Sequence, residues 1–145
     1  MTVPSWDDQL RVGVDLMDSD HREFVELLGR LDRAADAAFG ALFAELIGHT
    51  EAHFLRENTL MEEAGFPALV PHRTEHARVL DEMRAMDGRL ADGDVDTVRG
   101  YVRDELPAWF LNHRNTMDFV TARFLQQPQG EAQPVCGPPC MDCAE

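Results

Sequence analysis

The stretch ALFAELIGHTEAHFLRENTLMEEAGFP occupies residues 41–67. Its apolar residues recur at helical spacing, so it predicts a long helix from about Ala41 to Ala64. Gly65 is a natural C-terminal stop for that helix, and Phe66-Pro67 begins a short connection. Strand patterns are nearly absent from the whole chain, because β-branched residues are scarce and no convincing period-two run occurs. We therefore expect an all-α fold.

A helix is predicted on the N-terminal side of this stretch. The side chains of Asp18, Ser19 and Asp20 offer an N-cap for it. It is expected to run to about Ala38, where Phe39–Gly40 permits a turn. Residues before the cap are expected to form an irregular arm.

Two helices are predicted on the C-terminal side. Pro71 suits the first turn of one, which is expected to reach Asp87 or Leu90. The other covers roughly 95–125, and Pro107 should kink it or split it in two.

Four long helices joined by short loops indicate an up-down-up-down four-helix bundle. The bundle is expected to comprise residues 1–127, followed by a flexible tail over 128–145 that is rich in proline and ends in a cysteine cluster. The large apolar side chains at helical spacing are read as core: Phe24, Phe43, Leu46, Phe54, Leu80, Met83, Trp109 and Phe119.

The composition excludes several classes of function. The chain has 145 residues, of which 44% are hydrophobic, and a net charge of −14. Such a charge repels nucleic acids and anionic membranes, so neither is expected as a partner. The N-terminus shows no signal peptide, and no stretch has the roughly 20 apolar residues of a membrane span. We expect a cytoplasmic protein.

The histidines are arranged in pairs with acidic residues or with each other. His53 and Glu57 are four residues apart, as are His72 and His76, and this spacing puts both side chains on one helix face. Two further candidates on the fourth helix, five residues apart, are expected to be splayed by roughly 140° at ~100° per residue. These are His113 and Asp118. Two ligands splayed in this way can still reach one cluster if it is large enough to bridge.

His21 adds a candidate ligand from the first helix. Each helix of the bundle thus offers one or two metal-type ligands, in total five imidazoles and two carboxylates. This is too many for a tetrahedral zinc site, and it suits two metals that share bridging carboxylates. Imidazole with carboxylate is compatible with iron or manganese. His49 fits no pair beyond its spacing to His53, and we place it outside the ligand set.

The chain resembles the hemerythrins, in particular their bacterial single-domain members. The resemblance runs from Trp6 to about Leu125. Its matching pieces are Asp18-Ser19-Asp20-His21, His53-Phe54-Leu55-Arg56-Glu57 with Met61, Gly65-Phe66-Pro67 before His72 and His76, and Trp109-Phe110-Leu111-Asn112-His113 with Asp118.

This resemblance implies a non-haem di-iron centre that binds O2 reversibly. It assigns one iron to three histidines and the other to two, with two bridging carboxylates and an oxo or hydroxo bridge. The three are His72, His76 and His113; the two are His21 and His53; the bridges are Glu57 and Asp118. O2 would bind at the two-histidine iron, and Phe110 would lie against it. At Asn58 and Arg114 this chain departs from the family's usual residues, which are a second Glu and an Ile.

The cysteines at Cys136, Cys140 and Cys143 leave three interpretations open. They could be reduced thiols of an unstructured tail, ligands of an additional thiolate-bound metal, or a reversible disulfide. A fourth ligand for a metal is missing from this segment.

For the whole chain the leading hypothesis is an O2 carrier, store or sensor, and not an enzyme. The alternatives are a di-iron enzyme acting on peroxide or nitric oxide, a protein of iron storage or donation, and a helical bundle without metal.

Overall fold

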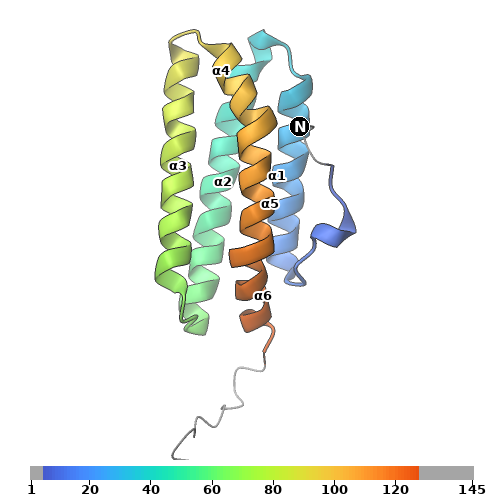
Figure 1. Ribbon diagram of the computed structural model, residues 1–145, viewed down its shortest axis with the longest axis vertical. Coiled ribbons are helices and arrows are strands. Elements are labelled where there is room, and N and C mark those ends of the chain that lie inside the picture. Colours follow the sequence, from blue (N-terminus) through green and yellow to red (C-terminus); the bar gives the residue numbers. More distant parts are fainter. Residues whose placement is uncertain (1–4, 128–145) are drawn as a thin grey trace, which may run out of the picture.

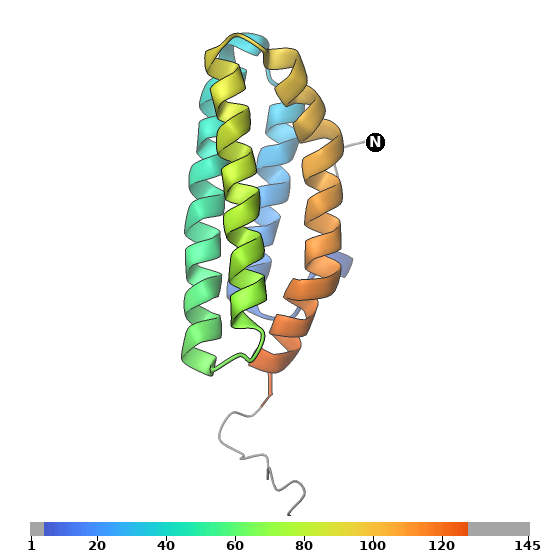
Figure 2. The ribbon, with the colours of Figure 1, turned by 60° about the vertical axis from the view of Figure 1, so that its left-hand side comes forward.

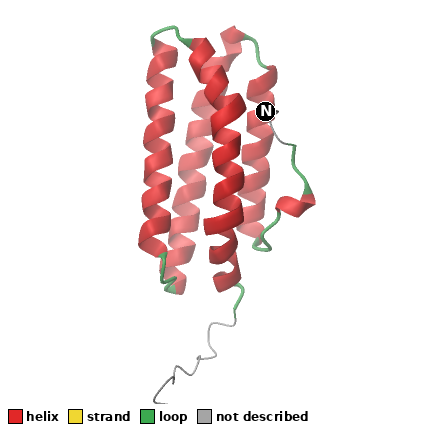
Figure 3. Cartoon of the chain, in the orientation of Figure 1, coloured by secondary structure: helices red, strands yellow, loops and turns green. Residues whose placement is uncertain are grey.

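The computed structural model describes residues 5–127 and confirms the all-α, up-down-up-down bundle (Figure 1; Figure 3). Three long helices are followed by a fourth helical run that is divided into five segments. The long helices are α1 (Asp15–Arg33), α2 (Asp36–Ala64) and α3 (Leu69–Ala91). The fourth run consists of α4 (Val95–Gly100), η2 (Tyr101–Glu105), α5 (Leu106–His113), η3 (Arg114–Asp118) and α6 (Phe119–Leu125).

The expected start of the first helix was wrong. α1 begins at Asp15, and Asp18 lies within its first turn. The Asp18 side chain does not cap the helix but binds the backbone of the residues that precede it. Its buried carboxylate accepts hydrogen bonds from the backbone N–H groups of Val12, at 2.7 Å, and Gly13, at 3.1 Å. These bonds hold the end of the N-terminal arm, which also contains the short 3-10 helix η1 (Asp8–Leu10), against the bundle.

The turn predicted at Phe39–Gly40 was also wrong. α1 ends at Arg33 and α2 begins at Asp36, so that Gly40 lies inside a helix. Phe39 and Phe43 are both fully buried, and their rings stack with centroids 6.3 Å apart. Burial of two phenylalanines on one helix face outweighs the roughly 1 kcal/mol that an internal glycine costs.

The fourth helical run continues through Pro107, and Figure 2 shows it as one column. The π-helical turn η2 directly precedes the proline, and the Leu106 N–H bonds the Tyr101 carbonyl five residues back. Proline offers no N–H and crowds the carbonyl four residues before it, and a widened turn accommodates both defects. The helical run is therefore not split at Pro107, and a π-helical turn marks the place where the sequence predicted a kink or a split.

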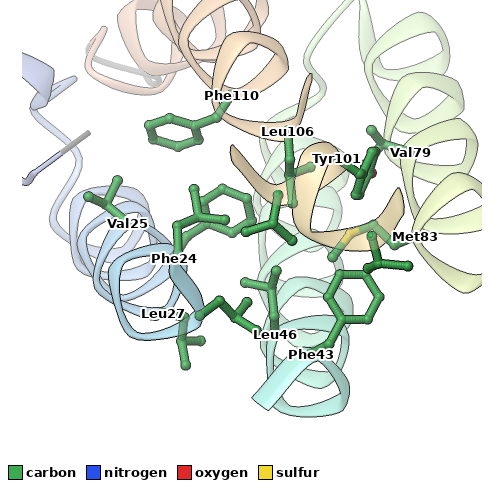
Figure 4. Packing of buried hydrophobic residues seen from close by; sticks show 14 of the residues in the cluster. Phe24, Val25, Leu27, Phe43, Leu46, Val79, Met83, Tyr101, Leu106 and Phe110 are labelled. Carbon is green, nitrogen blue, oxygen red and sulfur yellow. The ribbon is translucent and has the colours of Figure 1, made fainter. Parts of the chain in front are cut away.

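The apolar core occupies the half of the bundle that contains the α1–α2 and α3–α4 connections (Figure 4). Its fully buried members come from all four helical columns and include Leu28, Leu46, Met83 and Leu106. Phe119, expected in the core, is 41% exposed and has the Arg123 guanidinium over its ring. The π-helical turn η3 immediately before Phe119 rotates this part of the helix away from its expected register.

Candidate metal centre

The seven candidate ligands converge in the other half of the bundle. His21 lies on α1, and His53 and Glu57 lie on α2. The remaining four are His72 and His76 on α3, His113 at the end of α5 and Asp118 at the end of η3. All seven side chains are buried. Their ligand atoms form two groups, and within each group all atoms lie within 4.8 Å of one another. Glu57 contributes to both groups. The larger group is Glu57, His72, His76, His113 and Asp118, and the smaller is His21, His53 and Glu57.

Three imidazoles form one side of this cluster. The Nε2 atom of His113 lies 3.2 Å from Nε2 of His72 and 3.3 Å from Nε2 of His76. One oxygen of each carboxylate faces them. Oε1 of Glu57 is 3.1 Å from both His72 and His76, and Oδ1 of Asp118 is 3.1 Å from both His72 and His113.

Two imidazoles form the other side, and the second oxygen of each carboxylate faces them. Oε2 of Glu57 lies 3.4 Å from Nε2 of His53 and 3.9 Å from Nε2 of His21. Oδ2 of Asp118 lies 3.0 Å from the same His21 nitrogen. Both carboxylates therefore extend one oxygen to each side, which is the arrangement of a bridging ligand.

The residues of the cluster fit cations placed among them. Both ring nitrogens of His21 and both oxygens of Glu57 are buried without a partner in hydrogen-bond geometry. Buried polar atoms without partners are costly, and native proteins rarely retain them without a use. Imidazole nitrogens and carboxylate oxygens, with no thiolate among them, form a donor set that iron or manganese accepts.

The carboxylates and imidazoles of the cluster shift one another's pKa values when no metal is bound. Burial would raise the pKa values of Glu57 and Asp118, but the surrounding histidines hold both below the usual range. Burial lowers the pKa of His72, yet Asp118 and Glu57 more than offset this and raise it to about 9. Burial dominates at His76 and lowers its pKa to about 4. A cation at this site would compete with the His72 proton.

The splayed geometry expected for His113 and Asp118 was wrong. The turn between them is π-helical, with the Phe119 N–H bonded to the Arg114 carbonyl five residues back. In such a widened turn, residues five apart approach the same face of the helix. Both side chains therefore point into one cluster, with Asp118 Oδ1 3.1 Å from His113 Nε2.

Outer partners orient several of the imidazoles through their Nδ1 atoms. The Nδ1 of His72 lies 2.8 Å from Oγ1 of Thr121, and that of His76 lies 2.9 Å from the side-chain oxygen of Asn58. Neither partner was identified from the sequence. Thr121 is a single hydroxyl with no pattern around it, whereas Asn58 directly follows Glu57 and could have been considered.

The third outer partner is the carboxylate of Asp20. Its Oδ2 lies 3.0 Å from Nδ1 of His53, and Arg56 binds both oxygens, at 2.9 and 2.7 Å. Burial would raise the pKa of Asp20, but His53 and Arg56 hold it far below its usual range. The sequence suggested only a helix cap at Asp20. Its position next to His21 was the available signal for a role at the centre.

His49 lies outside the cluster. Its Nε2 donates to the Asp20 carbonyl at 3.0 Å, and its ring stacks on His53 with centroids 6.4 Å apart.

Arg114 turns away from the centre. Its guanidinium donates to the carbonyl oxygens of three residues in the N-terminal arm, Gln9, Leu10 and Arg11.

Phe110 lies at the two-histidine side. Its ring meets His21 edge-on, with centroids 5.4 Å apart, and stacks on Phe24 at 5.2 Å. With Phe54 and Trp109 it lines a small pocket that reaches His21 and His53, and also His113 and Asp118. A larger cavity of about 460 Å³, lined by Phe66, Pro71 and Val120 among others, reaches only His72 of the candidate ligands.

The C-terminal cysteines and the hydropathy of the helices bear on two further expectations from the sequence. The three cysteines, Cys136, Cys140 and Cys143, lie outside the described residues, and nothing in the structure or among related proteins supports the additional thiolate-bound metal. Within residues 5–127, no helix combines the length and the hydropathy needed to cross a membrane.

Similar proteins are found over most of the chain. The model of the hemerythrin HHE cation binding domain matches residues 12–125, which contain all seven clustered side chains. A bacteriohemerythrin of Ralstonia nicotianae is 39% identical over 133 residues, 92% of this chain and 96% of that protein. One of Stenotrophomonas maltophilia is 32% identical over 117 residues, 78% of this chain and 75% of the relative.

A more distant relative is myohemerythrin-1 of Phascolopsis gouldii. It is 30% identical over 114 residues, which cover 79% of this chain and 87% of that protein. The chain belongs to the hemerythrin family, whose members are oxygen-binding proteins rather than enzymes.

Proposed function

We propose that this protein binds O2 reversibly at a non-haem di-iron centre and acts as an O2 carrier, store or sensor. His72, His76 and His113 would hold one iron, and His21 and His53 the other. Glu57 and Asp118 would bridge them. The main support for this proposal is the orientation of the two carboxylates. Each directs one oxygen to the three-histidine side and the other to the two-histidine side.

The two-histidine side is the proposed O2 site. It has one imidazole fewer than the other side, and an incomplete ligand set is what distinguishes a reactive metal from a structural one. When bound, the iron pair would supply the electrons that O2 binding requires.

The chain's own residues shape the pocket at that side. Phe110 and Phe54 present carbon atoms to it, which exclude water and offer no proton to a ligand. Phe110 is fixed between His21 and Phe24, so the ring has little room to swing aside. These apolar side chains favour a small apolar ligand such as O2 and slow the escape of charged species from the pocket.

The proposal is tested by optical spectroscopy. Metal-free protein is loaded with Fe(II) under anaerobic conditions, exposed to air, and then returned to an O2-free atmosphere. We expect a new visible absorption band on exposure that disappears when O2 is removed, over several cycles. Irreversible oxidation in the first cycle would contradict reversible binding. Rapid consumption of added peroxide or nitric oxide would favour the enzyme hypothesis instead.

We propose in addition that residues 1–127 suffice for this function and that 128–145 lie outside the functional unit. The family match ends at residue 125, and the last described helix ends at Leu125. Deletion of residues 128–145 is expected to leave the O2-dependent spectrum intact. Loss of that spectrum would mean that the boundary is misplaced.

A further inference from the structure

The outer partners of the candidate ligands differ in charge between the two sides of the centre. On the three-histidine side, His72 and His76 are paired with a hydroxyl and an amide oxygen, both neutral. On the two-histidine side, His53 is paired with the carboxylate of Asp20 at 3.0 Å. A carboxylate that accepts a hydrogen bond from a ligand imidazole makes that imidazole a stronger donor to its metal. An iron on the two-histidine side would therefore have an anionic hydrogen-bond partner behind one of its imidazoles, His53.

Asp20 is held in place by Arg56. The guanidinium binds both carboxylate oxygens, through Nε at 2.9 Å and a terminal nitrogen at 2.7 Å. Two parallel hydrogen bonds of this kind fix the plane of the carboxylate as well as its position. The Asp20 side chain is 8% exposed, whereas that of Arg56 is 40% exposed. Arg56 therefore lies at the surface and binds the buried Asp20 carboxylate, but it contacts none of the candidate ligands.

The pair also connects the two helices that carry the two-histidine side. Asp20 precedes His21 on α1, and Arg56 lies between His53 and Glu57 on α2. The backbone carbonyl of Asp20 accepts a further hydrogen bond from His49 of α2 at 3.0 Å. Any displacement of α1 against α2 at this level would break several charge-assisted bonds. The spacing of His21 and His53 is thus fixed by this pair.

We propose that Asp20 and Arg56 are positioning residues that act together on His53. They strengthen metal binding at the two-histidine side and favour the ferric over the ferrous state of that iron. Arg56 acts only through Asp20, because it contacts the carboxylate and not the imidazole. The proposal rests on the proposed di-iron function for its redox part, while its metal-binding part depends only on the clustered side chains.

The metal-binding part is tested with Co(II), whose visible spectrum reports each site and does not require O2. Metal-free wild-type protein is expected to bind two equivalents. Asp20→Asn, which keeps the shape but removes the charge, should weaken one site by about 10–100-fold and leave the other unchanged. Arg56→Gln should weaken the same site by less. The double variant should be no weaker than Asp20→Asn alone, because Arg56 acts through Asp20.

Two matched controls accompany these variants. Glu26→Gln removes an exposed carboxylate of α1 that is paired with Arg22 and touches none of the candidate ligands. It should leave both Co(II) sites unchanged, which separates a specific contact from a general loss of charge. Thr121→Val removes the neutral partner of His72 and should weaken only the other site. Arg56 is well exposed, so Arg56→Gln keeps the test valid even if Asp20→Asn proves unstable.

The redox part is tested by reductive titration of diferric protein with dithionite, in which each iron takes up one electron. In Asp20→Asn one iron should be reduced at a higher potential than in the wild type, while the potentials of Glu26→Gln should be unchanged. Equal weakening of both Co(II) sites, additive effects in the double variant, or unchanged potentials in Asp20→Asn would overturn the inference. Failure of wild-type protein to bind O2 reversibly would instead overturn the proposed function.

Discussion

The two halves of the bundle are held together in different ways. In the half that contains the α1–α2 and α3–α4 connections, fully buried apolar side chains such as Leu46 and Met83 fill the space between the helices. In the other half five imidazoles and two carboxylates lie between the helices, together with a smaller apolar cluster that includes Met17 and Ala122. The apolar half is stabilised mainly by burial and packing of these side chains. The polar half contains buried nitrogen and oxygen atoms that lie close to opposite charges but form no hydrogen bonds of regular geometry.

The residues that stabilise the fold and the candidate metal ligands are therefore concentrated at opposite ends of the bundle. Each long helix contributes apolar residues at one end and ligand-type residues at the other, as α2 does with Phe43 and His53. The apolar half can position the helices before a metal is present. The polar half can then provide a ligand set whose geometry is already approximately correct.

Loss of a bridging carboxylate should have the largest effect. In Glu57→Ala both irons lose a shared ligand, and the positive charges of the two metals lose a compensating anion. We expect the iron content after reconstitution to fall to a small fraction of the wild-type value, as measured by elemental analysis. His49→Ala serves as the control and should retain nearly full iron content. Equal losses in both variants would show that His49 belongs to the centre.

Phe110 connects the two halves, because it stacks on Phe24 of the apolar core and meets His21 of the centre. Phe110→Ala should therefore affect both. We expect a loss of about 3–5 kcal/mol in the free energy of unfolding, measured by denaturant titration. The O2-bound protein should also autoxidise faster with its iron content preserved, because solvent enters the pocket. An autoxidation rate equal to that of the wild type would mean that Phe110 does not guard the O2 site.

A cavity in the apolar half should affect stability but not the metal. Leu46 is fully buried, and Leu46→Ala should cost about 2–5 kcal/mol in the free energy of unfolding. Iron content and the optical spectrum should remain those of the wild type at temperatures where the variant is folded. A loss of iron comparable to that in Glu57→Ala would contradict the independence of the two halves.

The smallest expected effect is a pH dependence of the metal-free protein. The pKa of His72 is raised to about 9 in the folded state, so its stabilising contribution is complete below pH 6.5 and is lost as the pH rises through 9. The pKa of His76 is lowered to about 4, so this residue destabilises the fold as the pH falls from 6.5 towards 4. Together they predict maximal stability near pH 6.5.

Thermal unfolding between pH 5 and 9 measures this dependence. The melting temperature of the metal-free protein should decline between pH 6.5 and 9, whereas the iron-loaded protein should show no such decline from its ligands, since metal-bound histidines carry no extra proton. A metal-free protein that becomes more stable from pH 6.5 to 9 would contradict the pKa shifts described for the cluster.

The fold and the clustering of the candidate ligands follow from local patterns in the sequence. Spacing of three or four residues places side chains on one face of a helix, and Gly65 ends α2 in the left-handed conformation, as expected, with φ of 67°. Metal-type residues on four separate helices can meet only where the helices of a bundle face one another. These inferences need no knowledge of distant contacts.

The errors arose where tertiary contacts overrode local preferences. Asp18 caps the arm rather than the helix, and Gly40 is carried into α2 by the burial of Phe39. The π-helical turns cannot be read from spacing, because the additional residue in each turn is tolerated only through packing elsewhere. They altered the positions expected for Asp118 and Phe119. The outer partners lie far from their histidines in sequence, as Thr121 does from His72.

The central claim is that these seven side chains hold two irons per chain. Anaerobic titration of the metal-free protein with Fe(II), with bound metal determined after separation from free iron, tests it most directly. We predict saturation at two irons per chain, and loss of both in Glu57→Ala. Saturation at one iron, or retention of two irons in Glu57→Ala, would contradict a pair of metals bridged by Glu57 and Asp118.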